Sequence, residues 1–167
     1  MRHIIGILLQ NESGALSRVA AMFASRGYNI ESLSVSATDD PAISRITLVT
    51  KGSDAVVQQI ANQLHKLIDI VSVDDMTAED HLERELALIR VRVRPAQREA
   101  VQSLLTQAGG RVLNDERDCL IVEITSSEAA ISELARNLAA TAEMLEIVRS
   151  GALGMLRQER VLHVVEG

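Results

Sequence analysis

A short segment, Asn11–Leu16, combines residue types that suit recognition of a small anion. It reads Asn-Glu-Ser-Gly-Ala-Leu and separates an apolar run from an amphipathic repeat. If it joins a strand to a helix, the unpaired N–H groups and the dipole of the helix N-terminus favour a carboxylate or phosphate. Gly14 permits close approach to the backbone, and Asn11 offers a donor and an acceptor. A capping turn that contains a glycine is the alternative, and residue chemistry alone leaves both interpretations open.

Residues that could serve catalysis or bind a metal are scattered along the chain. The four histidines, His3, His65, His81 and His163, form no HxxxH pair, and the single cysteine, Cys119, lies in an apolar stretch without a nearby base. Such spacing predicts neither a metal site nor a nucleophile. The adjacent acids Asp39 and Asp40 precede Pro41 and are typical of a turn. We therefore expect no catalytic residue and no metal ligand in this chain.

Three arginines, Arg90, Arg92 and Arg94, alternate along the sequence. On a strand, a period of two directs all three guanidinium groups to one side of the sheet. This pattern is compatible with a solvated sheet face or with docking to an acidic partner surface.

Composition limits the classes of protein to which the chain can belong. Of 167 residues, 47% are hydrophobic, 24% are charged and 1% are aromatic, with a formal net charge of −6. This apolar content excludes intrinsic disorder and is sufficient for one ordinary domain or two small ones. Acidity and scarce aromatic residues argue against a nucleic-acid partner. The chain has a single cysteine, and its apolar run at residues 4–9 is too short for a membrane span. Because no export signal is recognisable either, we expect a cytoplasmic protein.

The segments around Asn11–Leu16 predict the elements that would position it. Residues 4–9 are aliphatic without alternation, which indicates a strand buried on both faces. Apolar residues at i, i+3, i+4, i+7 and i+8 then predict a helix that ends at Gly27; they are Leu16, Val19, Ala20, Phe23 and Ala24. Residues 32–37 and 43–50 predict two further strands, residues 57–68 a second helix, and residues 71–73 a short last strand.

The same order recurs in the second half. Strands are expected over residues 86–93, 111–114, 119–125 and 145–148, with helices within 101–108 and 128–138. Ile5 and Leu88 are 83 positions apart, as are Gly27 and Gly110, which indicates an internal structural repeat. Each half therefore reads βαββαβ. The predicted fold class is α+β, with two tandem ferredoxin-like domains whose antiparallel sheets carry helices on one face.

The polar residues 77–81 lack periodicity and predict a domain boundary. We expect domains at 1–78 and 79–157, followed by a C-terminal tail at 158–167. The open sheet face of the first domain would carry Ser32, Ser34 and Thr47. Aliphatic strands at open edges suggest that two chains join their sheets as a homodimer. Asn29, just after the first helix, could then reach the Asn11–Leu16 segment of the second chain.

Residues 11–50, NESGALSRVAAMFASRGYNIESLSVSATDDPAISRITLVT, closely resemble the ACT domain of the small regulatory subunit of acetolactate synthase (acetohydroxyacid synthase). The likeness continues through QLHKLIDIVSV (63–73), EDHLERELALIRV (79–91) and EIVRSGALGMLRQE (146–159). It spans nearly the whole chain, and the first stretch is far more specific than a βαββαβ pattern.

The resemblance implies a protein that binds and activates the thiamine-diphosphate-dependent catalytic (large) subunit and confers feedback inhibition by a branched-chain amino acid, usually valine. In such subunits valine lies between two ACT domains of a homodimer. The loop that meets its carboxylate and amine is matched by Asn11, Glu12, Ser13, Gly14, Ala15 and Leu16, and the facing chain contributes the positions of Asn29 and Ile30. Thiamine diphosphate, Mg and FAD are expected on the catalytic subunit and no cofactor on this chain.

Two other functions remain as alternatives. One is a free-standing amino-acid sensor that controls a transcription factor or another enzyme. The other is a small ferredoxin-like enzyme. Co-purification with a large thiamine-dependent subunit would favour the regulatory subunit over the free-standing sensor. An activity assay of the isolated chain tests whether it is an enzyme.

Overall fold

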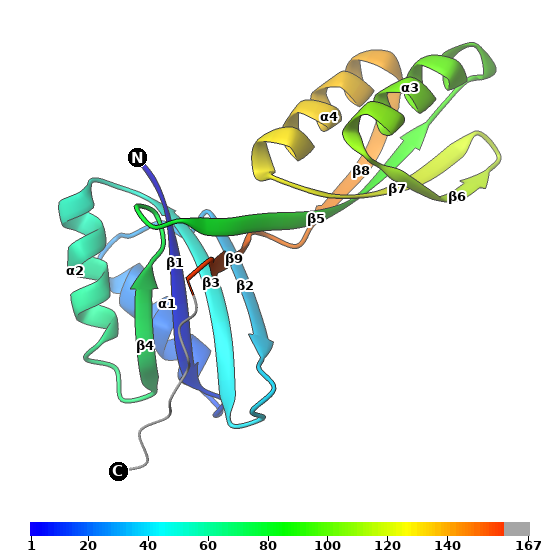
Figure 1. Cartoon of the computed structure of the whole chain (residues 1–167). Coiled ribbons are helices and arrows are strands. Elements are labelled where there is room, and N and C mark those ends of the chain that lie inside the picture. The colour runs from blue at the N-terminus through cyan, green and yellow to red at the C-terminus, as the bar shows by residue number, and fades with distance from the viewer. Residues whose placement is uncertain (159–167) are drawn as a thin grey trace. The chain divides into compact units, whose positions relative to one another are not determined.

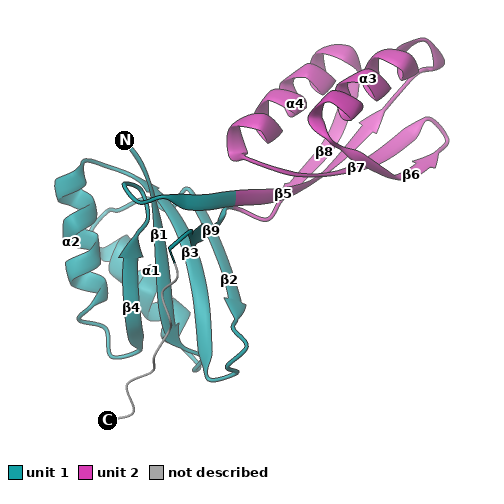
Figure 2. Cartoon of the chain, in the orientation of Figure 1, with its two compact units in different colours: residues 1–83, 152–167 teal, residues 84–151 magenta. Residues whose placement is uncertain are grey.

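The computed structural model describes residues 1–158 and divides into two compact units (Figures 1 and 2). Of the described residues, 1–83 and 152–158 form the first unit, and residues 84–151 form the second. Apart from Gln158, the expected tail at 158–167 lies outside the described residues.

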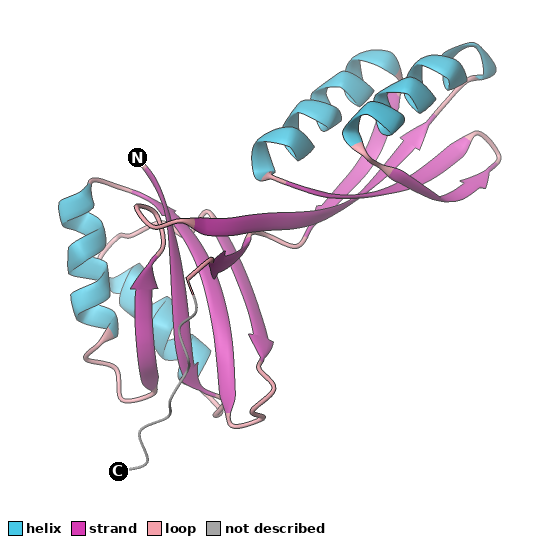
Figure 3. Ribbon diagram, viewed as in Figure 1, coloured by secondary structure: helices cyan, strands magenta, loops and turns pink. Residues whose placement is uncertain are grey.

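The first unit is a four-stranded antiparallel sheet with two helices (Figure 3). Its elements are β1 (Arg2–Gln10), α1 (Ala15–Ser25), β2 (Ser32–Ala37), β3 (Ile43–Lys51), α2 (Asp54–Leu64) and β4 (Ile70–Asp75). The strand order β2-β3-β1-β4 places β1 in the centre, antiparallel to β3 and β4. This arrangement confirms the βαββαβ order predicted for the first half.

Helix α1 packs on this sheet through a face slightly rotated from the predicted one. The residues that it buries are Ala15, Val19, Met22 and Phe23. Their spacing of i, i+4, i+7 and i+8 also satisfies the helical repeat, so the sequence pattern allowed two neighbouring faces. Leu16, Ala20 and Ala24 were expected in the core, but they are exposed, Leu16 by 40%. Helix α1 therefore presents an outward row of apolar residues at i, i+4 and i+8.

The second face of the first sheet is covered, which corrects the expectation of an open face. Met76 and Ala152 are buried against Ile4 of β1 and Val49 of β3. The chain returns after the second unit to complete this cover, and N–H groups of the returning segment meet two hydroxyls that were expected to face solvent. Ala152 N–H donates to Ser32 Oγ (3.1 Å) and Gly154 N–H to Thr47 Oγ1 (3.3 Å). This cover explains why β1 is buried on both faces, as its uninterrupted aliphatic run predicted.

The returning segment contains a strand that was not predicted, β9 (Leu153–Leu156), which pairs with β5 (His81–Arg92). Next to it, Arg157 N–H donates to the carbonyl of Asp80 (3.0 Å). By compactness the units divide after Glu83, and residues 152–157 group with the first unit, whereas the domain bounds expected from the sequence were 1–78 and 79–157. The polar character of residues 77–81 marked a loop, and β5 begins directly after it.

The second unit repeats the same topology with β5 as its central strand. Its other elements are the short 3₁₀ helix η1 (Pro95–Gln97), α3 (Arg98–Ala108), β6 (Arg111–Glu116), β7 (Cys119–Ser126), α4 (Glu128–Thr141) and β8 (Glu143–Arg149). The strand order is β6-β7-β5-β8, and the core lies between the sheet and the two helices. Helices α1 and α3 both span 11 residues, and their first residues, Ala15 and Arg98, are 83 positions apart. The two ferredoxin-like halves and the internal repeat are thereby confirmed.

Candidate functional site

The Asn11–Leu16 segment joins the central strand β1 to the N-terminus of α1, as the sequence predicted. Gly14 precedes the helix with φ 88° and ψ −11°, a left-handed conformation that glycine adopts without steric cost. Within residues 1–158, the backbone N–H groups of Ser13, Gly14 and Leu16 donate to no acceptor. Free N–H groups at the start of an 11-residue helix favour a bound carboxylate.

Asn11 is fixed by the loop between β2 and β3. Its backbone N–H donates to the carbonyl of Ala42 (2.7 Å), and its Nδ2 donates to the carbonyl of Pro41 (2.9 Å). These bonds use the backbone N–H and one of the two N–H groups of the side-chain amide, and they fix the orientation of the side-chain oxygen, which remains an acceptor. An acceptor beside free N–H groups matches the ammonium and carboxylate of an amino acid.

A salt bridge that the sequence analysis did not identify borders this loop. Arg18 donates through Nη2 to Asp69 Oδ1 (2.8 Å) and through Nε to Oδ2 (2.5 Å), which connects α1 to the residue before β4. The hydrogen bonds from Arg18 lower the pKa of Asp69. A Cβ atom on Gly14 would lie 2.9 Å from Nη1 of Arg18, so the guanidinium group lies against the loop. The spacing of four residues between Gly14 and Arg18 could have indicated that the arginine lies against the loop. Nothing in the sequence indicated that Asp69 is buried.

Asn29 and Ile30 lie beyond the other end of α1, separated from the loop by about 16 Å of helix. The structure therefore does not bring these two residues to the Asn11–Leu16 segment of the same chain. Asn29 Nδ2 donates to Glu31 Oε1 (2.8 Å), and Lys51 Nζ lies 3.0 Å from Glu31 Oε2. Hydrogen bonds from Lys51 and Asn29 lower the pKa of Glu31. This network leaves the Asn29 side-chain oxygen exposed as an acceptor.

The arginine row differs from the expectation. Arg90 and Arg92 lie on β5 and form ion pairs of 2.8 Å with Glu146 and Glu143 of β8. Arg94 lies beyond the end of the strand, where the chain turns into η1. The row is therefore largely neutralised within its own sheet, which weakens the interpretation as a basic docking face.

No group of three or more His, Cys, Asp or Glu residues that could hold a metal ion occurs within residues 1–158. His3 is buried, with Nε2 3.3 Å from the carbonyl of Gly52, and Cys119 is half-buried at the start of β7. His163 lies outside the described residues. Among the described helices, none has the length and apolar character required to cross a membrane.

Comparison with known proteins gives consistent matches over both units. A family model described as an AHAS small subunit-like ACT domain matches residues 5–72, and a model for the small subunit of acetolactate synthase matches residues 84–158. The isozyme 3 small subunit of acetolactate synthase from Salmonella typhimurium is 38% identical over 97% of this chain and 99% of its own length. A probable acetolactate synthase small subunit from Archaeoglobus fulgidus is 40% identical over 94% of this chain and 98% of its own.

A solved structure supports the same assignment. The crystal structure of the acetolactate synthase small subunit from Thermotoga maritima matches with a TM-score of 0.85 at 32% identity, covering 96% of this chain and 99% of the other. Several relatives are more than 30% identical to this chain over nearly their full length, and family models match both units. The chain therefore belongs to the acetolactate synthase small-subunit family.

Proposed function

We propose that this chain binds the catalytic subunit of acetolactate synthase, raises its activity and makes it sensitive to feedback inhibition by valine. The relatives are small subunits of that synthase, which supports a large-subunit partner. The effector function is supported by the corner at Gly14, where a left-handed glycine, free N–H groups and the guanidinium group of Arg18 come together. That corner suits the carboxylate of a small amino acid, and we infer that it is the regulatory site.

We infer that the complete effector site needs two copies of the chain. The loop Asn11–Leu16 supplies Asn11, Glu12, Ser13, Gly14, Ala15 and Leu16, whereas Asn29 and Ile30 lie at the far end of α1. A second chain whose Asn29 faces this loop would place an amide oxygen near the amine of the effector. The outward apolar row on α1 and the free edge of β2 favour such a homodimer, because both would otherwise expose apolar or unpaired backbone groups.

The chemistry of the synthase is assigned to the partner. We expect thiamine diphosphate, Mg and FAD on the catalytic subunit, and this chain to act through differential binding of valine to the inhibited form of the complex. The pathway is branched-chain amino acid synthesis, and we expect it in the cytoplasm.

Reconstitution tests this proposal. The purified catalytic subunit is assayed for acetolactate formation from pyruvate, alone and with increasing amounts of this chain, at several valine concentrations. We expect a rise in turnover that saturates with the small subunit, and inhibition by valine only when the small subunit is present. The chain alone, supplied with thiamine diphosphate, Mg and FAD, should form no acetolactate. Turnover by the isolated chain would support the enzyme alternative, and a catalytic subunit indifferent to the chain would support a free-standing sensor.

A further inference from the structure

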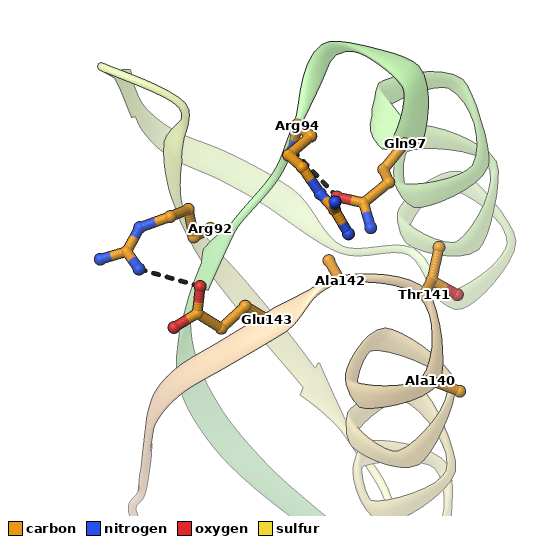
Figure 4. A pocket seen from close by; sticks show the side chains of 7 residues that line it. All are labelled: Arg92, Arg94, Gln97, Ala140, Thr141, Ala142 and Glu143. Atoms are coloured by element: carbon orange, nitrogen blue, oxygen red, sulfur yellow. Dashed lines mark hydrogen bonds and ion pairs between the residues drawn. The ribbon is translucent and has the colours of Figure 1, made fainter.

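The second unit contains a cavity that the proposed function does not use. It has a volume of about 520 Å³ and lies where β5 ends, beside η1 and the connection from α4 to β8 (Figure 4). Its lining residues are Arg92, Arg94, Gln97, Ala140, Thr141, Ala142 and Glu143. The volume falls within the range of about 300–1,000 Å³ typical of small-molecule sites.

The donors in this cavity are oriented by local hydrogen bonds. Arg94 N–H donates to Gln97 Oε1 (3.0 Å), and Gln97 N–H donates to the carbonyl of Arg94 (2.8 Å). Because the amide oxygen is occupied, the Nε2 group of Gln97 remains as a donor. Figure 4 shows this amide and the guanidinium group of Arg94 directed into the same space. A guanidinium fork next to an amide donor matches the geometry of a carboxylate or phosphate.

The charges around the cavity leave one arginine in excess. Arg92 Nη1 lies 2.8 Å from Glu143 Oε2, so these two lining charges compensate each other. Arg94 forms no ion pair with any acidic residue among residues 1–158. The Thr141 hydroxyl donates to the carbonyl of Asn137 (2.8 Å) and is not available to a ligand as a donor. The net positive charge of the cavity is therefore located at Arg94.

The internal repeat explains why this corner is hollow. Counted back by the 83 residues that separate α1 from α3, Arg94 and Gln97 correspond to Asn11 and Gly14. In the first unit this corner is bridged by Arg18 and Asp69. Their counterparts are Val101, which is buried, and Ala142, the residue before β8. Neither can form an ion pair, and the space that the salt bridge fills in one unit is a cavity in the other.

We propose that this cavity is a second ligand site, which binds the carboxylate or phosphate group of a small molecule through Arg94 and Gln97. All of its residues belong to the second unit, so the site is complete in one chain and does not depend on the effector site at Asn11–Leu16. Arg94 binds two oxygens of the ligand, Gln97 Nε2 binds one of them, and the Arg92–Glu143 pair closes the rim.

Titrations followed by the backbone amide NMR signals of the full chain test the site. Inorganic phosphate and acetate are added separately, each against sodium chloride at equal ionic strength. We expect saturable shifts at residues 92–94, 96–97 and 140–143 with at least one of the two oxyanions and not with chloride. Saturation by phosphate identifies a phosphate ligand, and saturation by acetate alone identifies a carboxylate. Equal shifts with chloride, or no saturation with either oxyanion, would overturn the proposal.

Three variants link the response to Arg94. Arg94→Gln should raise the dissociation constant roughly tenfold or more, because it removes the charged fork. Arg94→Lys keeps the charge without the fork and should give an intermediate value. Arg136→Gln makes the same charge change on exposed α4 surface outside the cavity and should bind like the unmodified chain. Wild-type binding by Arg94→Gln, or equal weakening by Arg136→Gln, would contradict a site at Arg94.

Discussion

Gly14 and Arg18 are in such close contact that a Cβ atom at position 14 would lie 2.9 Å from Nη1 of the arginine. The backbone at Gly14 is also left-handed, with φ 88°. The loop therefore combines a conformational and a spatial requirement at one residue. Both requirements lie on the surface that we assign to the carboxylate of the effector.

Gly14→Asp should give a complex that is still activated but resists valine. The new carboxylate would occupy the position of the effector carboxylate and compete with Asp69 for Arg18. Allosteric coupling is typically about 1–3 kcal/mol, so we expect the inhibitory valine concentration to rise roughly tenfold or more. Valine titration of the reconstituted complex measures it.

Gly109→Asp is the matched control for this variant. Gly109 also has a positive φ, 71°, but a Cβ there meets no atom within 4 Å. Both variants should lose about 1 kcal/mol of stability to the left-handed backbone, and only Gly14→Asp should alter valine inhibition. An equal valine response in the two variants would place the effector elsewhere, and loss of activation by Gly14→Asp alone would assign Gly14 to subunit docking.

The Arg18–Asp69 pair should make stability depend on pH in the acid range. The pKa of Asp69 is lowered in the folded chain, mainly by the hydrogen bonds from Arg18. The stabilisation is therefore fully present above the unfolded pKa of about 3.9 and is lost as pH falls through the lower, folded pKa. Urea unfolding between pH 6 and pH 2.5 measures this loss.

Asp69→Asn and Arg18→Gln should each make the free energy of unfolding less dependent on pH in the acid range. Asp69→Asn removes the titrating group, and Arg18→Gln removes the hydrogen bonds that lower the pKa of Asp69. Their stability curves should converge with that of the unmodified chain at the lowest pH. A slope in Arg18→Gln as steep as in the unmodified chain would show that other carboxyl groups dominate acid unfolding.

Gly154→Ala should destabilise the first unit by overpacking. A Cβ atom at this position would lie 2.6 Å from Met76 Cε and 2.9 Å from Ile4 Cδ1, and both side chains are buried. Such crowding typically costs about 1–3 kcal/mol. Chemical denaturation gives the cost, and repeating the substitution in a Met76→Ala background provides the control, because the shortened side chain frees the space. An unchanged cost in that background would mean that Met76 is not the obstacle.

In the proposed dimer, the β2 edge of the first sheet joins the second chain and the β4 edge does not. Val35 on β2 and Val71 on β4 are similarly exposed, by 41% and 46%. Val35→Glu should shift sedimentation towards a monomer and weaken valine binding, because it introduces a charge at the joining edge and separates Asn29 from the facing loop. Val71→Glu should do neither. Dissociation by Val71→Glu instead would move the interface to the other edge.

Much of the fold follows from local patterns in the sequence. The βαββαβ order of each half depends on strand and helix periodicities that residues close in the chain determine, and Gly27 and Gly109 end α1 and α3 in left-handed conformations. The rotation of α1 was not predictable, because Ala15 and Met22 form as good an apolar face with Phe23 as Leu16 and Ala24 do.

Features that depend on distant residues were the ones that the sequence did not reveal. The cover by Ala152 and Gly154 involves a strand of four residues, too short for a periodicity, and partners more than a hundred positions away. The candidate loop was found because its chemistry lies in six consecutive residues. Its neighbour Asp69 was missed because an isolated aspartate carries no sign of burial.

The return of Ala152–Leu156 to the first sheet has a consequence for synthesis on the ribosome. Ile4, Val49 and Met76 are in place early, but Ala152, which completes their cluster, emerges only after the whole second unit has been translated. Between Glu83 and Leu156 the ribosome adds 73 residues, which takes about 4–15 s at roughly 5–20 residues per second. During this interval the part of the sheet face around Ile4 and Val49 that Ala152 later covers is exposed in the nascent first unit. The emerging chain therefore has a window in which chaperones, or a second nascent copy, can compete for a surface that the segment around Ala152 and β9 later occupies.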